Sequence, residues 1–185
     1  MNAATLLARP RPDGNTARIL DWVEVDLHRI DHDTERIDLT ELAIGGCTPC
    51  CACTDSAEAP GCVVADDAQA VFRKLIAADG IVHATPLYMW GVGAQLKALL
   101  DRSLCLVRDY GSPDHRSFVE GRRTALVLTC GGPEEANAEA VTTMFPRFAE
   151  FLKLDNRGAF VFPHCGEPAG CRTPTGPRPA NWPAC

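Results

Sequence analysis

The pattern of apolar and polar residues divides the chain into segments that are predicted alternately as strands and helices. Five short segments are predicted strands, namely 5–8, 36–39, 81–84, 124–129 and 159–162. The stretches between them repeat apolar residues every three or four positions, as amphipathic helices do, starting near Asn15, Asp66, Val92 and Glu134. Strands that alternate with helices predict an α/β fold in which a mostly parallel sheet is covered on both faces.

Two prolines and the end of the chain break this pattern. Thr85-Pro86 is expected to stop the third strand, and Pro146 predicts a kink or break in the last helix. From residue 163 to 185 the chain has six prolines and no helical stripe. We therefore expect one domain over residues 1–162, followed by an irregular, proline-rich tail over 163–185. Because no helix is predicted after the last strand, something else is expected to cover the sheet there.

Composition narrows the class of protein. The chain has 185 residues, 46% hydrophobic and 23% charged, which suits one ordinary globular domain. Its net charge of −6 argues against a broad nucleic-acid surface, which needs a basic face. No apolar run reaches the length of a membrane span, and the start of the chain lacks the features of a signal peptide. A cytoplasmic protein that binds neither nucleic acid nor membrane is therefore expected.

The chain has 10 cysteines, and half of them lie between residues 47 and 62. Four follow the spacing Cys47-x2-Cys50-x2-Cys53-x8-Cys62, with Cys51 as an extra. In a reducing compartment, such a segment is more typical of metal binding or redox chemistry than of disulfides. The spacing is similar to that of [4Fe–4S] ligands. Zinc accepts the same sulfur ligands, and unligated thiols are a third interpretation, so the residues alone leave three alternatives open.

In an open parallel sheet, ligands bind beyond the carboxyl ends of the strands, and three such ends carry unusual residues. Residues 9–16 combine two arginines, a glycine and an Asn-Thr pair at the start of a helix, which suits a phosphate. Residues 85–91 place a tyrosine, a methionine and a tryptophan directly after a buried strand, where they can form a wall for a ring system. Residues 129–132 include two glycines that let the backbone approach a ligand edge.

In this order the segments resemble the NADPH-dependent FMN reductase branch of the flavodoxin-like superfamily, over about residues 5–170. That family has a Ser-Pro-Arg-x-x-Gly-Asn-Thr phosphate loop, a cysteine segment followed by Asp-Asp, a Ser-Pro-x-Tyr segment and a Gln-x-Lys…Asp-Arg helix. The corresponding segments here are 9–16, 66–67, 85–88 and 95–102. Arg9 stands where the family has its serine. The cysteine motif also resembles that of the iron-sulfur flavoproteins, whose last spacer is usually somewhat shorter.

The resemblance implies a flavodoxin-like three-layer sandwich, with five parallel strands in the order 2-1-3-4-5 and FMN at the switch point. The residues it implies at the FMN phosphate are Arg9, Arg11, Gly14, Asn15 and Thr16. Those implied beside the ring system are Thr85, Pro86, Leu87, Tyr88 and Trp90, and those at its pyrimidine edge are Thr129, Cys130, Gly131 and Gly132. The implied cluster ligands are Cys47, Cys50, Cys53 and Cys62.

The expected function is therefore an FMN-dependent NAD(P)H oxidoreductase. It would pass electrons from a nicotinamide to the flavin and on to a small-molecule or protein acceptor, with or without a [4Fe–4S] cluster on the way. No catalytic side chain is expected, because the flavin carries the chemistry. Two alternatives are an electron carrier that has no nicotinamide site and a zinc-stabilised scaffold that has no redox role. A homodimer or homotetramer is expected, because active sites in such reductases commonly lie near subunit contacts.

Overall fold

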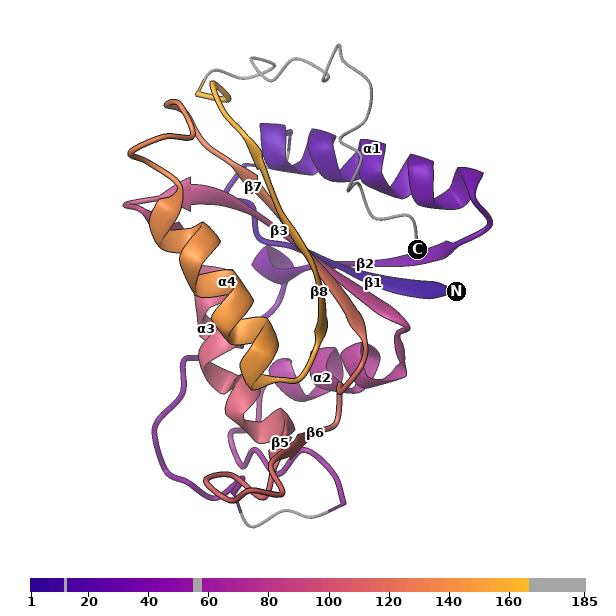
Figure 1. Ribbon diagram of the computed structural model, residues 1–185, viewed down its shortest axis with the longest axis vertical. Helices are drawn as coiled ribbons and strands as arrows, with labels where there is room; N and C mark the ends of the chain where they lie inside the picture. The colour runs from indigo at the N-terminus through magenta and orange to yellow at the C-terminus, as the bar shows by residue number, and fades with distance from the viewer. Residues whose placement is uncertain (12, 55–57, 167–185) are drawn as a thin grey trace.

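The structure is a computed structural model that describes residues 1–11, 13–54 and 58–166 (Figure 1). Its main sheet is parallel and has the strand order β2-β1-β3-β7-β8, which confirms the predicted flavodoxin-like order. The strands are β1 (Asn2–Leu7), β2 (Asp33–Asp38), β3 (Gly80–Tyr88), β7 (Arg123–Thr129) and β8 (Asp155–Phe162). Every predicted strand is present, and all five begin earlier than the sequence pattern indicates.

Four α-helices and several short elements connect these strands. The helices are α1 (Asn15–Arg29), α2 (Ala68–Ala77), α3 (Ala94–Arg102) and α4 (Glu139–Phe151). The short elements are two 3-10 helices, η1 (Leu39–Glu41) and η2 (Ser103–Leu106), and the strands β4 (Gly91–Val92), β5 (Val107–Arg108) and β6 (Arg116–Ser117). Strand β4 pairs antiparallel with the end of β3 and adds a sixth strand to the main sheet, where five were expected. Strands β5 and β6 pair in a separate hairpin.

The sheet has a buried apolar layer on each face (Figure 1). On one face, α1 packs on β1, β3 and β7 through the predicted stripe that includes Leu20, Val23 and Leu27. On the other face, α2, α3 and α4 cover the same strands. Within the described ranges, α1 is the one helix on its face, and Phe162 of β8 is only partly buried there. The predicted tail over residues 163–185 is described only up to residue 166.

Strand β3 differs from the expectation, because it continues through Thr85-Pro86 instead of stopping there. The carbonyl of Ala84 accepts from the amide of Ala8 on the neighbouring strand β1, at 2.9 Å. Backbone groups two residues apart on a strand face the same side, so Pro86 also faces this side. Because β1 ends at Leu7, Pro86 has no bond to β1 to lose, and a proline is tolerated at this position.

Helix α4 also differs from the expectation at both points that the sequence indicated. It begins at Glu139 instead of near Glu134, because Ala136 has a positive φ of 56° that no helix can contain. The helix then continues through Pro146, where a kink or break was expected. Packing of Val141, Phe145 and Ala149 against the sheet holds both sides of the proline in one helix.

The hairpin between β3 and β4 carries backbone strain. Its two central residues, Met89 and Trp90, have φ values of 47° and 58°, as in a type I′ turn. Side chains other than glycine, asparagine and aspartate rarely adopt this region. Both side chains are exposed, Met89 at 86% and Trp90 at 59%. The turn therefore displays two large side chains at the end of β3 at a cost in stability.

No helix in the described part of the chain is both long and apolar enough to cross a membrane.

Candidate functional site

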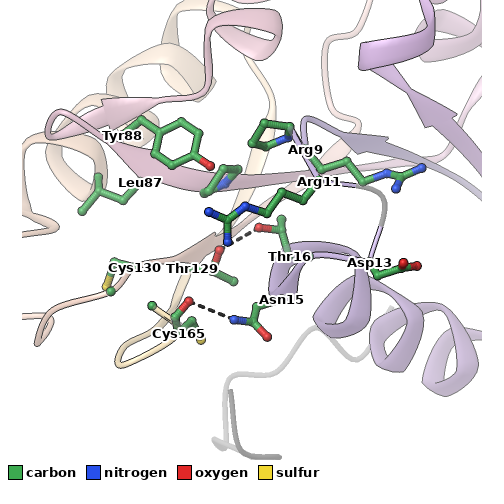
Figure 2. Close-up of a pocket in the computed structure, with 15 residues that line it drawn as sticks. Arg9, Arg11, Asp13, Asn15, Thr16, Leu87, Tyr88, Thr129, Cys130 and Cys165 are labelled. Atoms are coloured by element: carbon green, nitrogen blue, oxygen red, sulfur yellow. Dashed lines mark hydrogen bonds between the residues drawn. The ribbon is translucent and has the colours of Figure 1, made fainter. Parts of the chain in front are cut away.

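A pocket of about 230 Å³ opens at the carboxyl ends of β1, β3 and β7 (Figure 2). Its lining comes from the loop that follows β1, the end of β3, the end of β7 and the segment after β8. The lining residues are Arg9, Pro10, Arg11, Asp13, Gly14, Asn15, Thr16, Pro86, Leu87, Tyr88, Thr129, Cys130, Gly131, Cys165 and Gly166. This is the place where an open α/β sheet binds its ligands.

The N-terminus of α1 gives the pocket its anion-binding character. Gly14 caps this helix, and the first intrahelical bond runs from the amide of Arg18 to the carbonyl of Gly14, at 3.2 Å. The amides of Thr16 and Ala17 therefore have no partner inside the helix. The first turn contains no acidic residue that would compete with an anion. A Cβ atom on Gly14 would lie 3.2 Å from the carbonyl oxygen of Arg11, so a glycine keeps this turn tight.

The two arginines of the loop have different orientations. In Figure 2 the side chain of Arg11 reaches into the pocket, whereas that of Arg9 points away from it. The Arg9 guanidinium forms an ion pair with Asp38 at the end of β2, with its Nε 2.7 Å from the carboxylate. No carboxylate within the described ranges pairs with Arg11. Arg9 lines the pocket as predicted, but Arg11 is the arginine whose charge is available to a ligand.

Hydrogen bonds between distant segments close the floor of the pocket. The buried hydroxyls of Thr16 and Thr129 lie 2.7 Å apart and join the start of α1 to the end of β7. The amide group of Asn15 donates to the carbonyl of Cys165, at 2.9 Å, and so joins α1 to the segment that follows β8. These bonds fix the phosphate loop against two other strand ends, so the pocket is formed before any ligand arrives.

The opposite wall of the pocket is apolar. Pro86, Leu87 and Tyr88 line it, and the Tyr88 side chain is 49% exposed. The buried Thr85 lies behind this wall, where its hydroxyl accepts from the amide of Gly93 at 2.8 Å. That bond attaches the start of α3 to the end of β3. The combination of an anion site with an apolar wall suits a ligand that has a phosphate at one end and a ring system at the other.

Eleven of the fourteen residues predicted to contact the cofactor line the pocket. The other three, Thr85, Trp90 and Gly132, lie outside the lining. Thr85 supports the wall from behind, Trp90 lies in the exposed hairpin, and Gly132 faces the amide of Asn137. Four lining residues were not predicted, namely Pro10, Asp13, Cys165 and Gly166. Because Cys165 and Gly166 follow β8, the same rule of carboxyl strand ends could have identified them.

The cysteine segment lies at the other end of α3, beside β5 and β6 (Figure 1). Cys47, Cys50 and Cys51 are exposed, whereas Cys53 and Cys62 are partly buried against the core. All five carry free thiols. In the described part of the chain, no three cysteine, histidine or acidic side chains are arranged to hold a metal ion.

The thiols of this segment nevertheless lie near one another. Burial raises the pKa of Cys53, and the nearby Cys62, Cys47 and Cys50 raise it further. Burial also raises the pKa of Cys105 in η2 to about 12, with contributions from Cys62 and Cys53. As a donor set, four free thiols on one segment suit a sulfur-ligated centre, although the segment does not hold them in a ligating geometry.

Comparison with known proteins agrees with this geometry. Over residues 1–164 the chain matches the family described as NADPH-dependent FMN reductase. An iron-sulfur flavoprotein from Methanosarcina thermophila is 31% identical over 140 residues, which are 75% of this chain and 68% of that protein. Another, from Archaeoglobus fulgidus, is 30% identical over 138 residues, which are 73% of this chain and 58% of that protein.

Among solved structures, the NAD(P)H:quinone oxidoreductase from Methanothermobacter marburgensis has the same fold, with a TM-score of 0.66. It is 17% identical and covers 89% of this chain and 84% of its own. The family match includes the phosphate loop, the apolar wall and the cysteine segment. It confirms the expected class, an oxidoreductase of the FMN reductase type, at the level of the family. This chain belongs to the NADPH-dependent FMN reductase family.

Proposed function

We propose that this protein is an FMN-dependent NAD(P)H oxidoreductase whose flavin occupies the pocket at the end of β1. The observation that carries the proposal is the pairing of an anion site with an apolar wall in one preformed pocket. The anion site is the N-terminus of α1 with Arg11, and the wall is residues 86–88. FMN has a phosphate and a tricyclic ring, so it matches both parts.

In this proposal the residues of the chain bind and orient the cofactor. The first-turn amides of α1, the Thr16 hydroxyl and the Arg11 guanidinium would hold the phosphate. Pro86, Leu87 and Tyr88 would border the ring, and the backbone of Thr129 to Gly131 would donate to or accept from its pyrimidine edge. When bound, FMN supplies hydride acceptance from a nicotinamide and electron release to an acceptor. The flavin carries this chemistry, so the proposal needs no protein acid or base.

A [4Fe–4S] cluster at Cys47, Cys50, Cys53 and Cys62 is the second part of the proposal. The spacing of the cysteines, their free thiols and the iron-sulfur flavoprotein relatives support it. Such a cluster would add one-electron transfer to an external partner, either a small molecule or a protein. Zinc at the same thiols, or thiols without metal, would leave the flavin chemistry unchanged.

Two arginine variants test the flavin part of the proposal. Arg11→Gln removes a charged donor from the anion site, so we expect FMN to bind about 10 to 100 times more weakly, because a charged hydrogen bond contributes about 1.5–3 kcal/mol. Arg9→Gln is the matched control, since Arg9 is paired with Asp38. It should leave FMN affinity within about twofold, because the Arg9 guanidinium is held by Asp38 and points away from the pocket (Figure 2). A larger loss in the Arg9 variant than in the Arg11 variant would contradict the assignment.

NAD(P)H oxidation by the FMN-loaded protein separates the enzyme from its main alternative. Turnover with either nucleotide supports the oxidoreductase. If neither nucleotide is oxidised while FMN stays bound, the protein is an electron carrier that another protein reduces. We also propose a homodimer or homotetramer, which light scattering of the FMN-loaded protein would test directly.

A further inference from the structure

Arg102, the last residue of α3, is a buried charge that the flavin site does not use. Its side chain is only 1% exposed. The guanidinium donates to both carboxylate oxygens of Asp66, at 2.7 and 3.2 Å, and to the carbonyl of Gly45, at 3.1 Å. It also donates to the carbonyl of Val64, at 3.4 Å, and to the sulfur of Cys62, at 3.2 Å. All of these acceptors belong to the cysteine segment or directly flank it.

The positions of the acceptors along the chain show what this side chain does. Gly45 lies just before the first cysteine of the segment, and Asp66 lies just after the last. Asp66 strengthens the closure, because its carboxylate also accepts from the amide of Gly45, at 3.0 Å. Although burial raises the pKa of Asp66, hydrogen bonds from Arg102 and from the amides of Gly45 and Ala68 hold it below its usual value. One guanidinium thus joins both ends of the segment from 45 to 66.

Within the segment, Cys53 and Cys62 both pack against the core, and Cys62 is also held by hydrogen bonds. Its sulfur accepts from Arg102, and its carbonyl accepts from the side-chain amide of Gln69, at 3.0 Å. Cys47 and Cys50, in contrast, lie on an exposed part of the loop. Cys62 is therefore a metal ligand that is already fixed in position, and the exposed cysteines can fold toward it.

The charge of Arg102 has a second consequence. Four thiolates outweigh the positive charge of a zinc ion or of an iron-sulfur core, so a centre ligated by four cysteines is an anion. Placing an anion next to an apolar core is unfavourable unless a cation accompanies it. Arginine stays charged at any pH a protein experiences, and its planar fork bonds several acceptors at once. Asp66 already offsets the charge of Arg102, so what the guanidinium gives the sulfurs is its Nε–H, which donates to Cys62.

We propose that Arg102 is the positioning residue of the cysteine segment. It closes the segment at both ends, fixes Cys62 as the anchored ligand and donates a hydrogen bond to the sulfur of an anionic sulfur-ligated centre there. This inference rests on the proposed centre at Cys47, Cys50, Cys53 and Cys62. It assigns a role to the arginine that ends α3, outside the flavin pocket and outside the set of ligands.

The closure is tested on the metal-free protein, where cluster chemistry plays no part. FMN-loaded Arg102→Met, Arg102→Lys and wild-type chains are freed of metal with a chelator and separated from the chelator by gel filtration. They are then digested in chelator-free buffer with thermolysin, which does not cleave at basic residues. We expect residues 45–66 to be cut at least about ten times faster in Arg102→Met, and almost as fast in Arg102→Lys, because a lysine cannot join several acceptors. Arg36→Met, which loses an ion pair with Asp21 and Glu24 on the far side of the sheet, is the control and should be cut at the wild-type rate.

The hydrogen bond to the sulfur is tested by anaerobic reconstitution with iron and sulfide. We expect at least about fivefold less cluster per chain in Arg102→Met, and a content between that and wild type in Arg102→Lys, which keeps the charge without the fork. Bound FMN reports folding, because its pocket lies at the other end of α3. If Arg102→Met does not retain FMN, Asp66→Asn takes its place and should be cut about three times faster than wild type, because it keeps Arg102 but removes the ion pair.

The two failures are distinguishable. If thermolysin cuts the Arg102 variants and wild type at the same rate, and cluster content is equal, the role of Arg102 is overturned while the cluster stands. If wild type takes up neither an iron-sulfur cluster nor zinc, the proposed centre is overturned. Faster cutting of the metal-free Arg102→Met chain would then still support the closure of the segment by Arg102.

Discussion

Lowering the pH should destabilise this protein through His83, which lies in the middle of β3. The side chain is buried, with 3% of the residue exposed. Its ring makes edge contacts with Phe145 and Phe148 of α4, at centroid distances of 5.4 and 5.9 Å. A cavity of about 10 Å³ beside it is otherwise lined by apolar residues and Ser103. With no carboxylate among these neighbours, burial lowers the pKa of His83 to about 4.

The size of the effect follows from the two pKa values. In the unfolded chain His83 titrates near 6.5, and in the folded chain near 4. The unfolded state therefore binds the proton first as the pH falls. The stability that neutral His83 contributes is fully present above pH 6.5 and is lost between pH 6.5 and 4. The total is about 3 kcal/mol, of which about 2 kcal/mol has been lost at pH 5.

The assay is urea unfolding of wild type and His83→Leu at a series of pH values from 5 to 7.5. Leucine removes the titration and keeps an apolar side chain of similar size. Between pH 7 and 5, the free energy of unfolding should fall by about 2 kcal/mol more in wild type than in the variant. Other titrating groups cancel in this difference. An equal fall in both proteins would refute the reasoning, since His83 would then share one pKa in the folded and unfolded states.

Three further predictions concern the pocket, the hairpin and the cysteine segment. Asn15→Asp should weaken FMN binding by about 1 kcal/mol or more, because the new carboxylate repels the phosphate. An FMN titration should show a smaller loss of affinity for Asn15→Ala, and added salt should reduce the difference in affinity between the two variants. Replacing Met89-Trp90 by Asn-Gly should raise the free energy of unfolding by about 1 kcal/mol, because these residues suit a type I′ turn; no gain on urea unfolding would mean that the turn is unstrained. Cys50→Ser should abolish the iron absorbance of the reconstituted protein and leave FMN bound, and loss of both would make the segment a folding element.

The sequence predicts the architecture well, because local patterns specify it. The stripe of Leu20, Val23 and Leu27 identifies α1, and the alternation of strands with helices predicts the parallel sheet, whereas its strand order was implied by the family resemblance. The errors occur where a local signal is overridden by a neighbour that is distant in sequence. Pro86 is a strand breaker in general, but here it faces a side where β1 has already ended. Pro146 stays inside α4 because core contacts on both sides hold the helix together.

Some features of the candidate site are local and could be predicted, and others depend on distant residues and could not. The glycine and the Asn-Thr pair of the phosphate loop act through local backbone geometry, so their positions in the pocket could be predicted. The different orientations of Arg9 and Arg11 could not, because they depend on Asp38, which lies 29 residues from Arg9. Likewise, nothing in the pattern of residues 94–102 indicates that Arg102 is buried and bonded to Cys62. Such pairings arise from tertiary structure, which periodicity does not encode.

The separation of the two sites by α3 affects how any preparation of this protein should be analysed. The helix has nine residues and spans about 13 Å, with Gly93 attached behind the pocket wall and Arg102 attached to the cysteine segment. At such a distance, loading of one site is expected to be energetically independent of the other. With both proposed groups, a purified sample is a mixture of four species, and its doubly loaded fraction is the product of two occupancies. NAD(P)H oxidation should be normalised to the FMN content, and only electron transfer through the proposed cluster to that product.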